Sequence, residues 1–253
     1  MNILFTICGR SGSKGFKNKN LKKLNGIPLV YYTLSAIKLY QETHSDDSVT
    51  VAVNTDSQEL MEMVYNQKAV LNIQEIERKE KWAGDRAAKV DVIKDTYLKC
   101  RKQGPFDAVV DLDITSPMRR PADIEAAIRS LKDDPKCDLV FSVVEARRNP
   151  YFNMVEKQQE YFRKVCSSHF TTRQEAPAVY ELNASIYAFA PEFLEKDLEK
   201  TILEYNCRIV KMMDYLVLDI DSEEDFRLMS MLIEYFGQKD AELGKVIALA
   251  KEL

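Results

Sequence analysis

The sequence predicts an α/β protein with three layers, in which a mainly parallel, twisted sheet is covered by helices on both faces. Short runs rich in β-branched and aromatic residues alternate with longer stretches whose apolar residues recur at helical spacing. The 253 residues, 45% hydrophobic and 30% charged, have an ordinary globular composition and are sufficient for a sizeable core. Ligands of such proteins bind beyond the carboxyl ends of the parallel strands.

The predicted strands are short apolar runs bounded by turn or polar residues. They cover residues 3–8, 49–55, 107–114, 138–144, 185–190, 207–213 and 215–221.

The predicted helices begin at recognisable capping signals. Pro28 opens the first, Asp56 or Ser57 caps the second, and Ser222 with Asp225 resembles a capping box. The helices cover residues 28–40, 57–67, 87–103, 121–134, 222–237 and 238–253.

The alternation of strands and helices stops after Val144 and resumes at residue 185. We therefore expect residues 145–184 to form an inserted, hairpin-like subdomain. Residues 1–144 and 185–236 would make up the α/β domain, and residues 237–253 a C-terminal helical extension.

Composition excludes several classes of protein. The net charge of −4 argues against general nucleic-acid binding. The five cysteines lack a CxxC spacing, which favours free thiols in a reducing cytoplasm over a disulfide framework or zinc site. The apolar start is too short for a signal peptide, and no run approaches the length of a membrane span. A cytoplasmic protein without a membrane partner is expected.

A cationic, glycine-rich loop follows the first strand, and no acidic residue precedes Glu42. Glycines permit close approach of backbone N–H groups to an anion, and basic side chains neutralise phosphates. The sequence GxxxxGK[ST] of a P-loop is absent. The loop therefore predicts a phosphate site of another kind, while Lys17, Lys22 and Lys23 are expected in solvent. Its candidate residues are Gly9, Arg10, Ser11, Gly12, Ser13, Lys14 and Lys19.

A pair of carboxylates, Asp219 and Asp221, lies in the last predicted strand. Side chains alternate along a strand, so both would face the same side. Two hard oxygen ligands on one face suit Mg²⁺, or Mn²⁺, bridging phosphate oxygens.

The stretch "GRSGSKGFKNKNLKKLNGIPLVYYTL" closely resembles the signature of the acylneuraminate cytidylyltransferases, the CMP-sialic acid synthetases. The resemblance implies a Rossmann-like nucleotidyltransferase fold. It also implies that Arg10, Lys14, Lys19 and Asn20 hold the triphosphate of CTP. Cys8 and Gly9 depart from the Pro-Ala that the family usually has.

Residues 78–93 resemble the family segment that frames the cytosine, and Arg78, Ala83 and Asp85 match it. Lys79 and Trp82 depart from the family's Pro and Leu. From the residues alone, Arg78 could equally be a surface charge.

Residues 112–128 resemble a second family segment, in which Thr115 and Ser116 match and Asp113 replaces a Gln that contacts ligand. The change removes an N–H donor and adds a negative charge beside a negative substrate. Asp113 could tune the choice of sugar, demand an ordered metal or point to water.

Residues 171–189 resemble a third segment, with Arg173, Gln174 and Asn183 matching. Arg173 is the candidate to bind the acceptor's carboxylate, because guanidinium matches carboxylate bidentately. A salt bridge to Glu175 or Glu181 is the alternative. The preceding subdomain corresponds to the family's dimerisation subdomain, which implies a homodimer. Residues 216–226 match the family's Asp-Ile-Asp segment.

The implied activity is that of a cytidylyltransferase, which activates a nonulosonic (sialic-type) acid with CTP to a CMP-sugar for cell-surface glycan synthesis. Arg10, Lys14 and Lys19 would act catalytically by stabilising the leaving pyrophosphate. Neither of the two histidines, His44 and His169, is expected to act as a general base. The alternatives are a non-catalytic or altered-specificity nucleotide-binding homologue, and a cytidylyltransferase for another 2-keto sugar acid such as 3-deoxy-manno-octulosonate.

Overall fold

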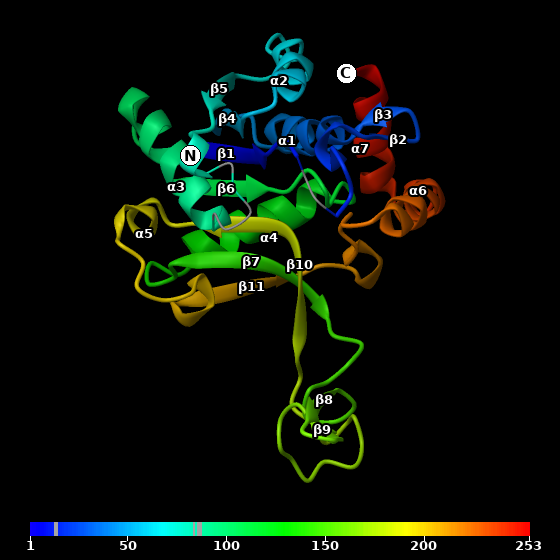
Figure 1. Cartoon of the computed structure of the whole chain (residues 1–253). Coiled ribbons are helices and arrows are strands. Elements are labelled where there is room, and N and C mark those ends of the chain that lie inside the picture. Colours follow the sequence, from blue (N-terminus) through cyan, green and yellow to red (C-terminus); the bar gives the residue numbers. More distant parts are fainter. Residues whose placement is uncertain (13–14, 83, 85–87) are drawn as a thin grey trace.

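The structure is a computed structural model that describes residues 1–12, 15–82, 84 and 88–253. Its centre is a seven-stranded sheet of order β11-β7-β10-β6-β1-β4-β5 (Figure 1). β10 runs antiparallel between β6 and β7, and the other neighbours pair in parallel. The strands of this sheet are β1 (Asn2–Gly9), β4 (Ser48–Thr55), β5 (Ile73–Glu77), β6 (Ala108–Leu112), β7 (Leu139–Glu145), β10 (Tyr180–Phe189) and β11 (Cys207–Lys211).

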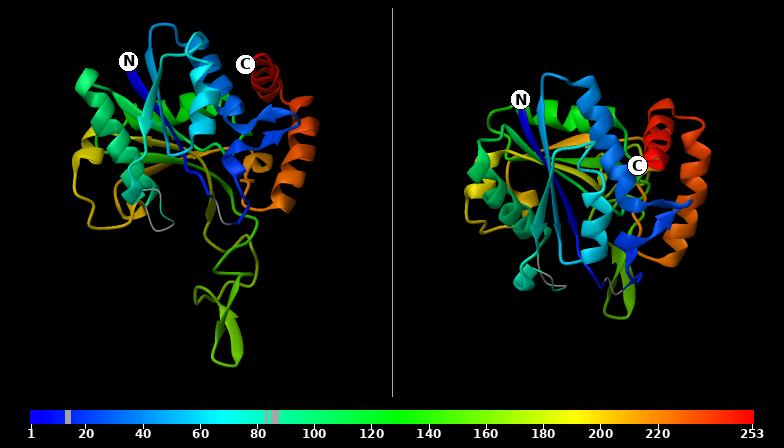
Figure 2. Two further views of the ribbon diagram at one scale, coloured as in Figure 1. Left: turned by 45° about the horizontal axis from the view of Figure 1, so that its top comes forward. Right: turned by 90° about the horizontal axis from the view of Figure 1, so that it is seen from above.

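Helices cover the sheet on both sides (Figure 2). Two small hairpins complete the strands: β2 (Lys23–Leu24) with β3 (Ile27–Pro28), and β8 (Val155–Gln158) with β9 (Tyr161–Lys164). The α-helices are α1 (Leu29–Thr43), α2 (Gln58–Tyr65), α3 (Lys89–Cys100), α4 (Pro121–Lys132), α5 (Pro191–Glu195), α6 (Glu223–Gly237) and α7 (Ala241–Glu252).

Strand alternation divides the apolar residues of β1 between two cores. Ile3, Phe5 and Ile7 belong to the larger core, which includes residues of α1, α2, α4 and α7. Leu4 belongs to the smaller core, with residues of α3 and α5. Thr6 and Cys8 therefore share the α3 side of the sheet. This side carries polar residues at the carboxyl end of the strands.

α7 is part of the main core, since Leu243, Val246 and Ala250 are buried within it. The helix packs closely on the end of α6, because a Cβ at Gly244 would lie 2.7 Å from the Gly237 carbonyl oxygen. The predicted helix at the C-terminal end is thus confirmed, and it packs against the α/β layers.

Between β7 and β10 the chain leaves the sheet as a projecting arm, residues 145–184, which carries the β8–β9 hairpin (Figure 1). β10 continues from the arm into the sheet, with a register shift against β7 between Leu182 and Tyr187. A hairpin thus lies within the segment where the alternation of strands and helices stops. None of the described helices combines the length and apolar character needed to cross a membrane.

The predicted strand at 215–221 is wrong. A 3-10 helix, Asp214–Leu216, is followed there by irregular backbone, and the Ile220 amide donates to the Thr115 carbonyl oxygen at 2.9 Å. Leu216 and Ile220 are buried in the main core without joining a strand ladder, so an apolar pattern typical of a strand arises from burial alone. β5 was not predicted either: of its five residues only Ile73 is buried, because the strand lies at one edge of the sheet.

We expect Gly244→Ala to destabilise the protein, although alanine is the better helix former by about 1 kcal/mol. The added Cβ would lie against the backbone of α6, and overpacking typically costs about 1–3 kcal/mol. Urea unfolding measures the difference. Ala248→Gly, on the exposed side of α7, is the control and should lose only the helix preference. An unchanged or raised stability of Gly244→Ala would contradict the close packing of α6 and α7.

Candidate active site

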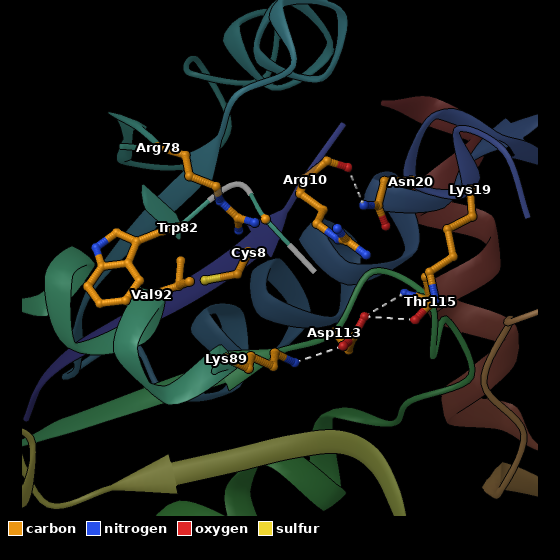
Figure 3. Close-up of a pocket in the computed structure, with 11 residues that line it drawn as sticks. Cys8, Arg10, Lys19, Asn20, Arg78, Trp82, Lys89, Val92, Asp113 and Thr115 are labelled. Atoms are coloured by element: carbon orange, nitrogen blue, oxygen red, sulfur yellow. Dashed lines mark hydrogen bonds and ion pairs between the residues drawn. The ribbon is translucent and has the colours of Figure 1, made fainter. Parts of the chain in front are cut away.

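A cleft lies where β1, β4, β5 and β6 end, beside the first turn of α3 (Figure 3). Its volume is about 230 Å³. Parallel strands bring their carboxyl ends to one edge of the sheet, so residues distant in the sequence meet there. The cleft is lined by Cys8, Arg10, Lys19, Asn20, Arg78, Trp82, Gly84, Lys89, Val92, Asp113 and Thr115.

The loop after β1 starts in a close-packed position. A Cβ at Gly9 would lie 2.6 Å from Leu60 Cδ2, so only glycine fits without displacement. Gly12 has a φ of 67°, in the region that glycine favours. The Asn20 side chain donates to the Arg10 carbonyl oxygen at 3.0 Å, which joins the two ends of the loop. Ser13 and Lys14, two predicted phosphate ligands, lie outside the described residues.

Asp56, expected from the sequence only as a possible helix cap, holds this loop. Its carboxylate accepts from the Ser11 amide at 2.7 Å and from the Ser11 hydroxyl at 2.6 Å. Burial opposes the ionisation of Asp56, but these bonds and the charge of Arg78 outweigh burial and lower its pKa. The donors of Ser11, predicted to bind phosphate, are therefore engaged by a protein carboxylate in this structure.

Lys19 connects the loop to the segment that carries the predicted metal ligands. Its ammonium lies 2.8 Å from Asp221 Oδ1 and 3.0 Å from the Ile220 carbonyl oxygen. A Cβ at Gly15 would lie 3.0 Å from the Asp221 carbonyl oxygen, so the two segments are in direct contact. The predicted phosphate loop and the carboxylate pair are thus neighbours.

Asp219 and Asp221 have the donor atoms that a hard cation requires. Burial raises the pKa of Asp219, and the negative charges of Asp221 and Asp113 raise it further. This excess of negative charge fits a divalent cation bound by two carboxylates and substrate oxygens. In the described parts of the chain, no three His, Cys, Asp or Glu side chains form a group able to hold a metal by themselves.

Arg78 is a buried residue, which rules out the surface alternative. Its Nε donates to Asn54 Oδ1 at 3.0 Å and its Nη2 to the Asn54 carbonyl oxygen at 3.2 Å. Asn54 in turn donates to Thr96 at 2.8 Å, so the guanidinium has a fixed orientation in the cleft wall near Trp82. Ala83 and Asp85, the other predicted cytosine contacts, lie outside the described residues.

Asp113 is engaged on both carboxylate oxygens rather than pointing to water. Oδ2 accepts from Lys89 Nζ at 2.7 Å, and Oδ1 accepts from the Thr115 amide at 3.0 Å and hydroxyl at 2.8 Å (Figure 3). Burial opposes its ionisation, yet the Lys89 charge and these bonds hold the pKa of Asp113 well below its usual range. Asp113 is therefore ionised at neutral pH and unsuited to act as a base.

Lys89 also lies 2.8 Å from Asp111 Oδ2. Asp111 is fully buried, and its other oxygen accepts from Thr6 at 2.7 Å. Asp111 and Asp113 are two residues apart and lie on the same side, the α3 side, at the end of β6. This spacing could have predicted the pair from the sequence, but Asp111 and Lys89 were not predicted as site residues.

Arg119 completes this cluster from behind. The guanidinium is fully buried and donates to the carbonyl oxygens of Asp113 at 2.9 Å and Ser185 at 2.8 Å. Burial lowers the pKa of Arg119 to about 10, which leaves it charged at neutral pH. Ser116, a predicted sugar contact, is buried nearby and donates to the Asn183 carbonyl oxygen at 3.4 Å, whereas Thr115 lines the cleft.

The remaining predicted sugar contacts do not line the cleft of their own chain. Arg173 is exposed and donates to the Ala146 carbonyl oxygen at 2.8 Å, while Glu175 accepts from Thr171 and Thr172. Gln174 is exposed in the same arm. The buried Asn183 amide donates to the Leu216 carbonyl oxygen at 3.0 Å and accepts from Ser142 at 2.6 Å.

Residues 4–250 match the family model described as Cytidylyltransferase. The chain belongs to this cytidylyltransferase family. It is 35% identical over 238 residues to the post-translational flagellin modification protein B of Campylobacter coli, covering 92% of this chain and 95% of that one. It is 36% identical over 234 residues to the CMP-N,N'-diacetyllegionaminic acid synthase of Campylobacter jejuni, covering 91% and 94%.

Solved structures of cytidylyltransferases have the same fold. The chain resembles a CMP:2-keto-3-deoxy-manno-octonic acid synthetase complexed with CTP, with a TM-score of 0.66, 16% identity and coverage of 93% of this chain and 99% of that one. It also resembles a cytidylyltransferase from Leptospira borgpetersenii, with a TM-score of 0.58, 14% identity and coverage of 99% and 94%. The expected Rossmann-like nucleotidyltransferase fold is confirmed.

We expect Asp219→Asn to stabilise this cytidylyltransferase against unfolding in metal-free buffer at pH 7. The pKa of Asp219 is raised in the folded state, so folding disfavours its charged form and loses stability as the pH rises past the usual aspartate pKa of about 4. Thermal unfolding from pH 3.5 to 8 should show the advantage of the variant increasing with pH. Equal midpoints across this range would contradict the electrostatic strain at Asp219.

Proposed function

We propose that the protein transfers the cytidylyl group of CTP to a nonulosonic acid of the sialic type and releases pyrophosphate. The observation that carries the proposal is the distribution of charge in the cleft. Arg10, Lys19 and the Asp219–Asp221 pair lie toward one side, and the buried Arg78 guanidinium lines the other wall. This arrangement suits a polyphosphate at one end and a base at the other.

In the proposed reaction, the anomeric hydroxyl oxygen of the acceptor forms a bond to the α-phosphorus of CTP and loses its proton to solvent. The bond from the α-phosphorus to the bridging oxygen breaks, and pyrophosphate leaves with the electron pair. Arg10, Lys14 and Lys19 would bind the phosphates and stabilise the negative charge that grows on the leaving group. Gly9, Ser11, Gly12, Ser13 and Asn20 would shape the loop around them.

The Lys19–Asp221 ion pair of 2.8 Å implies an exchange of partners on substrate binding. Lys19 would move its charge from Asp221 to phosphate oxygens, which leaves both carboxylates to a cation. Asp219 and Asp221 would then hold Mg²⁺ or Mn²⁺, which when bound neutralises phosphate charge and polarises the phosphorus–oxygen bonds.

Arg78 would donate hydrogen bonds to the cytosine base of CTP, and Ala83 and Asp85 would contribute to the same base site. Its orientation through Asn54 and Thr96 supports this role, because a guanidinium held by protein contacts loses little freedom on binding. Asp113 and Thr115 would face the acceptor, with the buried Ser116 and Asn183 supporting the same region.

The relative that is 36% identical is named a CMP-N,N'-diacetyllegionaminic acid synthase, which supports an acceptor of the legionaminic or a related nonulosonic class. The relative that is 35% identical is named a flagellin modification protein. A product of this kind would feed the glycosylation of surface structures. The likeness to the octonic acid synthetase supports the fold alone, at 16% identity.

Pyrophosphate release with CTP and Mg²⁺ tests the function. We expect release with one acceptor among N-acetylneuraminate, N,N'-diacetyllegionaminate, pseudaminate and 3-deoxy-manno-octulosonate. Lys19→Gln should retain the fold but lose roughly 100-fold or more in kcat/KM, because it removes a positive charge that stabilises the leaving pyrophosphate. Lys23→Gln, an exposed change nearby, is the control. CTP binding without pyrophosphate release in the presence of any acceptor would favour the non-catalytic alternative. Pyrophosphate release only with 3-deoxy-manno-octulosonate would favour a cytidylyltransferase for that sugar acid.

We further propose that residues 145–184 are the subdomain through which two copies form a homodimer, and that the remaining residues form the nucleotidyltransferase domain with its C-terminal extension at 237–253. The arm projects from the sheet and exposes large apolar side chains, including Val155 at 60%, Tyr161 at 64% and Phe162 at 62%. Clustered exposed apolar residues mark interaction surfaces. Arg173 and Gln174 lie in this arm and would then contact the acceptor of the partner copy.

Sedimentation velocity tests the dimer. The wild type should sediment as a dimer at micromolar concentration, and Phe162→Glu should shift it toward the monomer because a carboxylate would be desolvated in the interface. Tyr235→Glu replaces an aromatic of similar exposure, 59%, on α6 and should leave the dimer intact. A monomeric wild type, or dissociation by both variants alike, would contradict the arm as the interface.

A further inference from the structure

Lys89 is a cation of the cleft whose charge is committed to the protein. Its ammonium lies 2.7 Å from Asp113 Oδ2 and 2.8 Å from Asp111 Oδ2, at the first residue of α3. The side chain is 35% exposed, so it reaches the cleft surface, whereas Asp111 has no exposed surface. Figure 3 shows Lys89 directed at Asp113 from the α3 side of the cleft.

The surrounding charges make Lys89 necessary. Asp111 and Asp113 are two carboxylates on the same side of the end of β6, and Arg119 donates to the backbone oxygen of Asp113 rather than to its carboxylate. With Lys89 and Arg119 present, two positive charges balance two negative ones. Among the described residues, Lys89 is the cation at ion-pair distance from the buried Asp111 carboxylate, and removing it would leave that charge uncompensated, which is strongly unfavourable.

Asp113 as held here has a defined chemical preference. An ionised carboxylate only accepts hydrogen bonds, so it favours a hydroxyl or N–H group and repels phosphate or carboxylate. Thr115 and Lys89 use three of the positions around its oxygens and fix its direction in the cleft wall. Triphosphate is favoured on the opposite side, near Arg10 and Lys19.

A second cavity adjoins the cleft at Lys89, which lines both. Its walls are mainly apolar and include Tyr187, Phe189, Leu198 and Ile202. Lys89 therefore stands at the boundary between the nucleotide cleft and a neighbouring space, where the orientation of a second substrate would be set.

We propose that Lys89 is a positioning residue for the acceptor: its ammonium holds the Asp113 carboxylate directed into the cleft, where Asp113 accepts a hydrogen bond from a hydroxyl or amide N–H of the acceptor. This inference rests on the proposed function and identifies a donor group as the feature of the acceptor that the site reads. Lys89 acts through Asp113 and does not itself bind the acceptor's carboxylate.

Steady-state kinetics of four variants with the active acceptor test this role. Lys89→Met should raise the acceptor KM or lower kcat so that kcat/KM falls about 10- to 100-fold, the effect of losing a hydrogen bond to a charged group. The KM for CTP should change less than twofold. Lys89→Arg should retain most activity, since a guanidinium can contact both carboxylates. Lys94→Met, which loses a surface contact on the same helix, is the control.

The double variant Lys89→Met/Asp113→Asn separates positioning from direct binding. A neutral amide at residue 113 needs no cation, so the double variant should recover part of the activity and thermal stability lost in Lys89→Met. A double variant no better than Lys89→Met, or an equal rise in the KM for CTP and for the acceptor, would overturn the role of Lys89 while the wild type remains active. A wild type inactive with every acceptor would instead overturn the proposed function, and the acceptor site with it.

Discussion

The parallel pairing of β1 with both β4 and β6 is the constraint on which the site depends. Gly9 pairs with Thr55, and Thr6 with Asp111, so three strands end at the same edge. The residues that follow those ends therefore lie close together, although they are far apart in the sequence. The loop after β1 is then held by Asp56 after β4, and the cleft wall is completed by Asp113 after β6. β1 is the middle strand of these three, because it pairs with β6 on one side and with β4 on the other.

The cations of this edge fall into two groups with different tasks. Lys89 and Arg119 balance the charges of Asp111 and Asp113, and Arg119 also donates to backbone oxygens, so both shape the wall of the cleft. Arg10 and Lys19 belong to the glycine-rich loop, beside the carboxylates at 219–221. The division gives the cleft a direction: anionic phosphates are favoured toward the loop, and donor groups are favoured toward Asp113. Burial and the neighbouring carboxylates raise the pKa of Asp219, so the folded protein disfavours its ionised form.

The arm has a different physical basis from the sheet. The ends of β7 and β10 pair with each other where the arm begins. The β8–β9 hairpin further along the arm has too few apolar residues to form a core, so nearly all of its residues are exposed. A hairpin of two short strands is marginally stable alone, and this arm leaves large aromatic side chains exposed, which agrees with the proposed interface. In the proposed dimer, the arm of one copy would lie beside the cleft of the other copy.

Much of this protein was determined by the sequence alone. Hydrophobic periodicity identified β1, β4, β6 and β7 and the helices that cover them, because burial on a fixed side of each element imposes its own spacing on the residues. The cationic loop indicated a phosphate site because glycines, basic residues and the absence of acids coincide within a few residues.

The tertiary structure alone decided which charges meet. Both Asp111–Asp113 and Asp219–Asp221 have the same spacing, but only the former lies at a strand end, where it contacts Lys89 from another element, 24 residues away from Asp113. The latter lies in irregular backbone, where the burial of Leu216 and Ile220 produced a false strand pattern. Local spacing specifies the side of an element that a residue occupies, but the partner across that side depends on packing between distant segments.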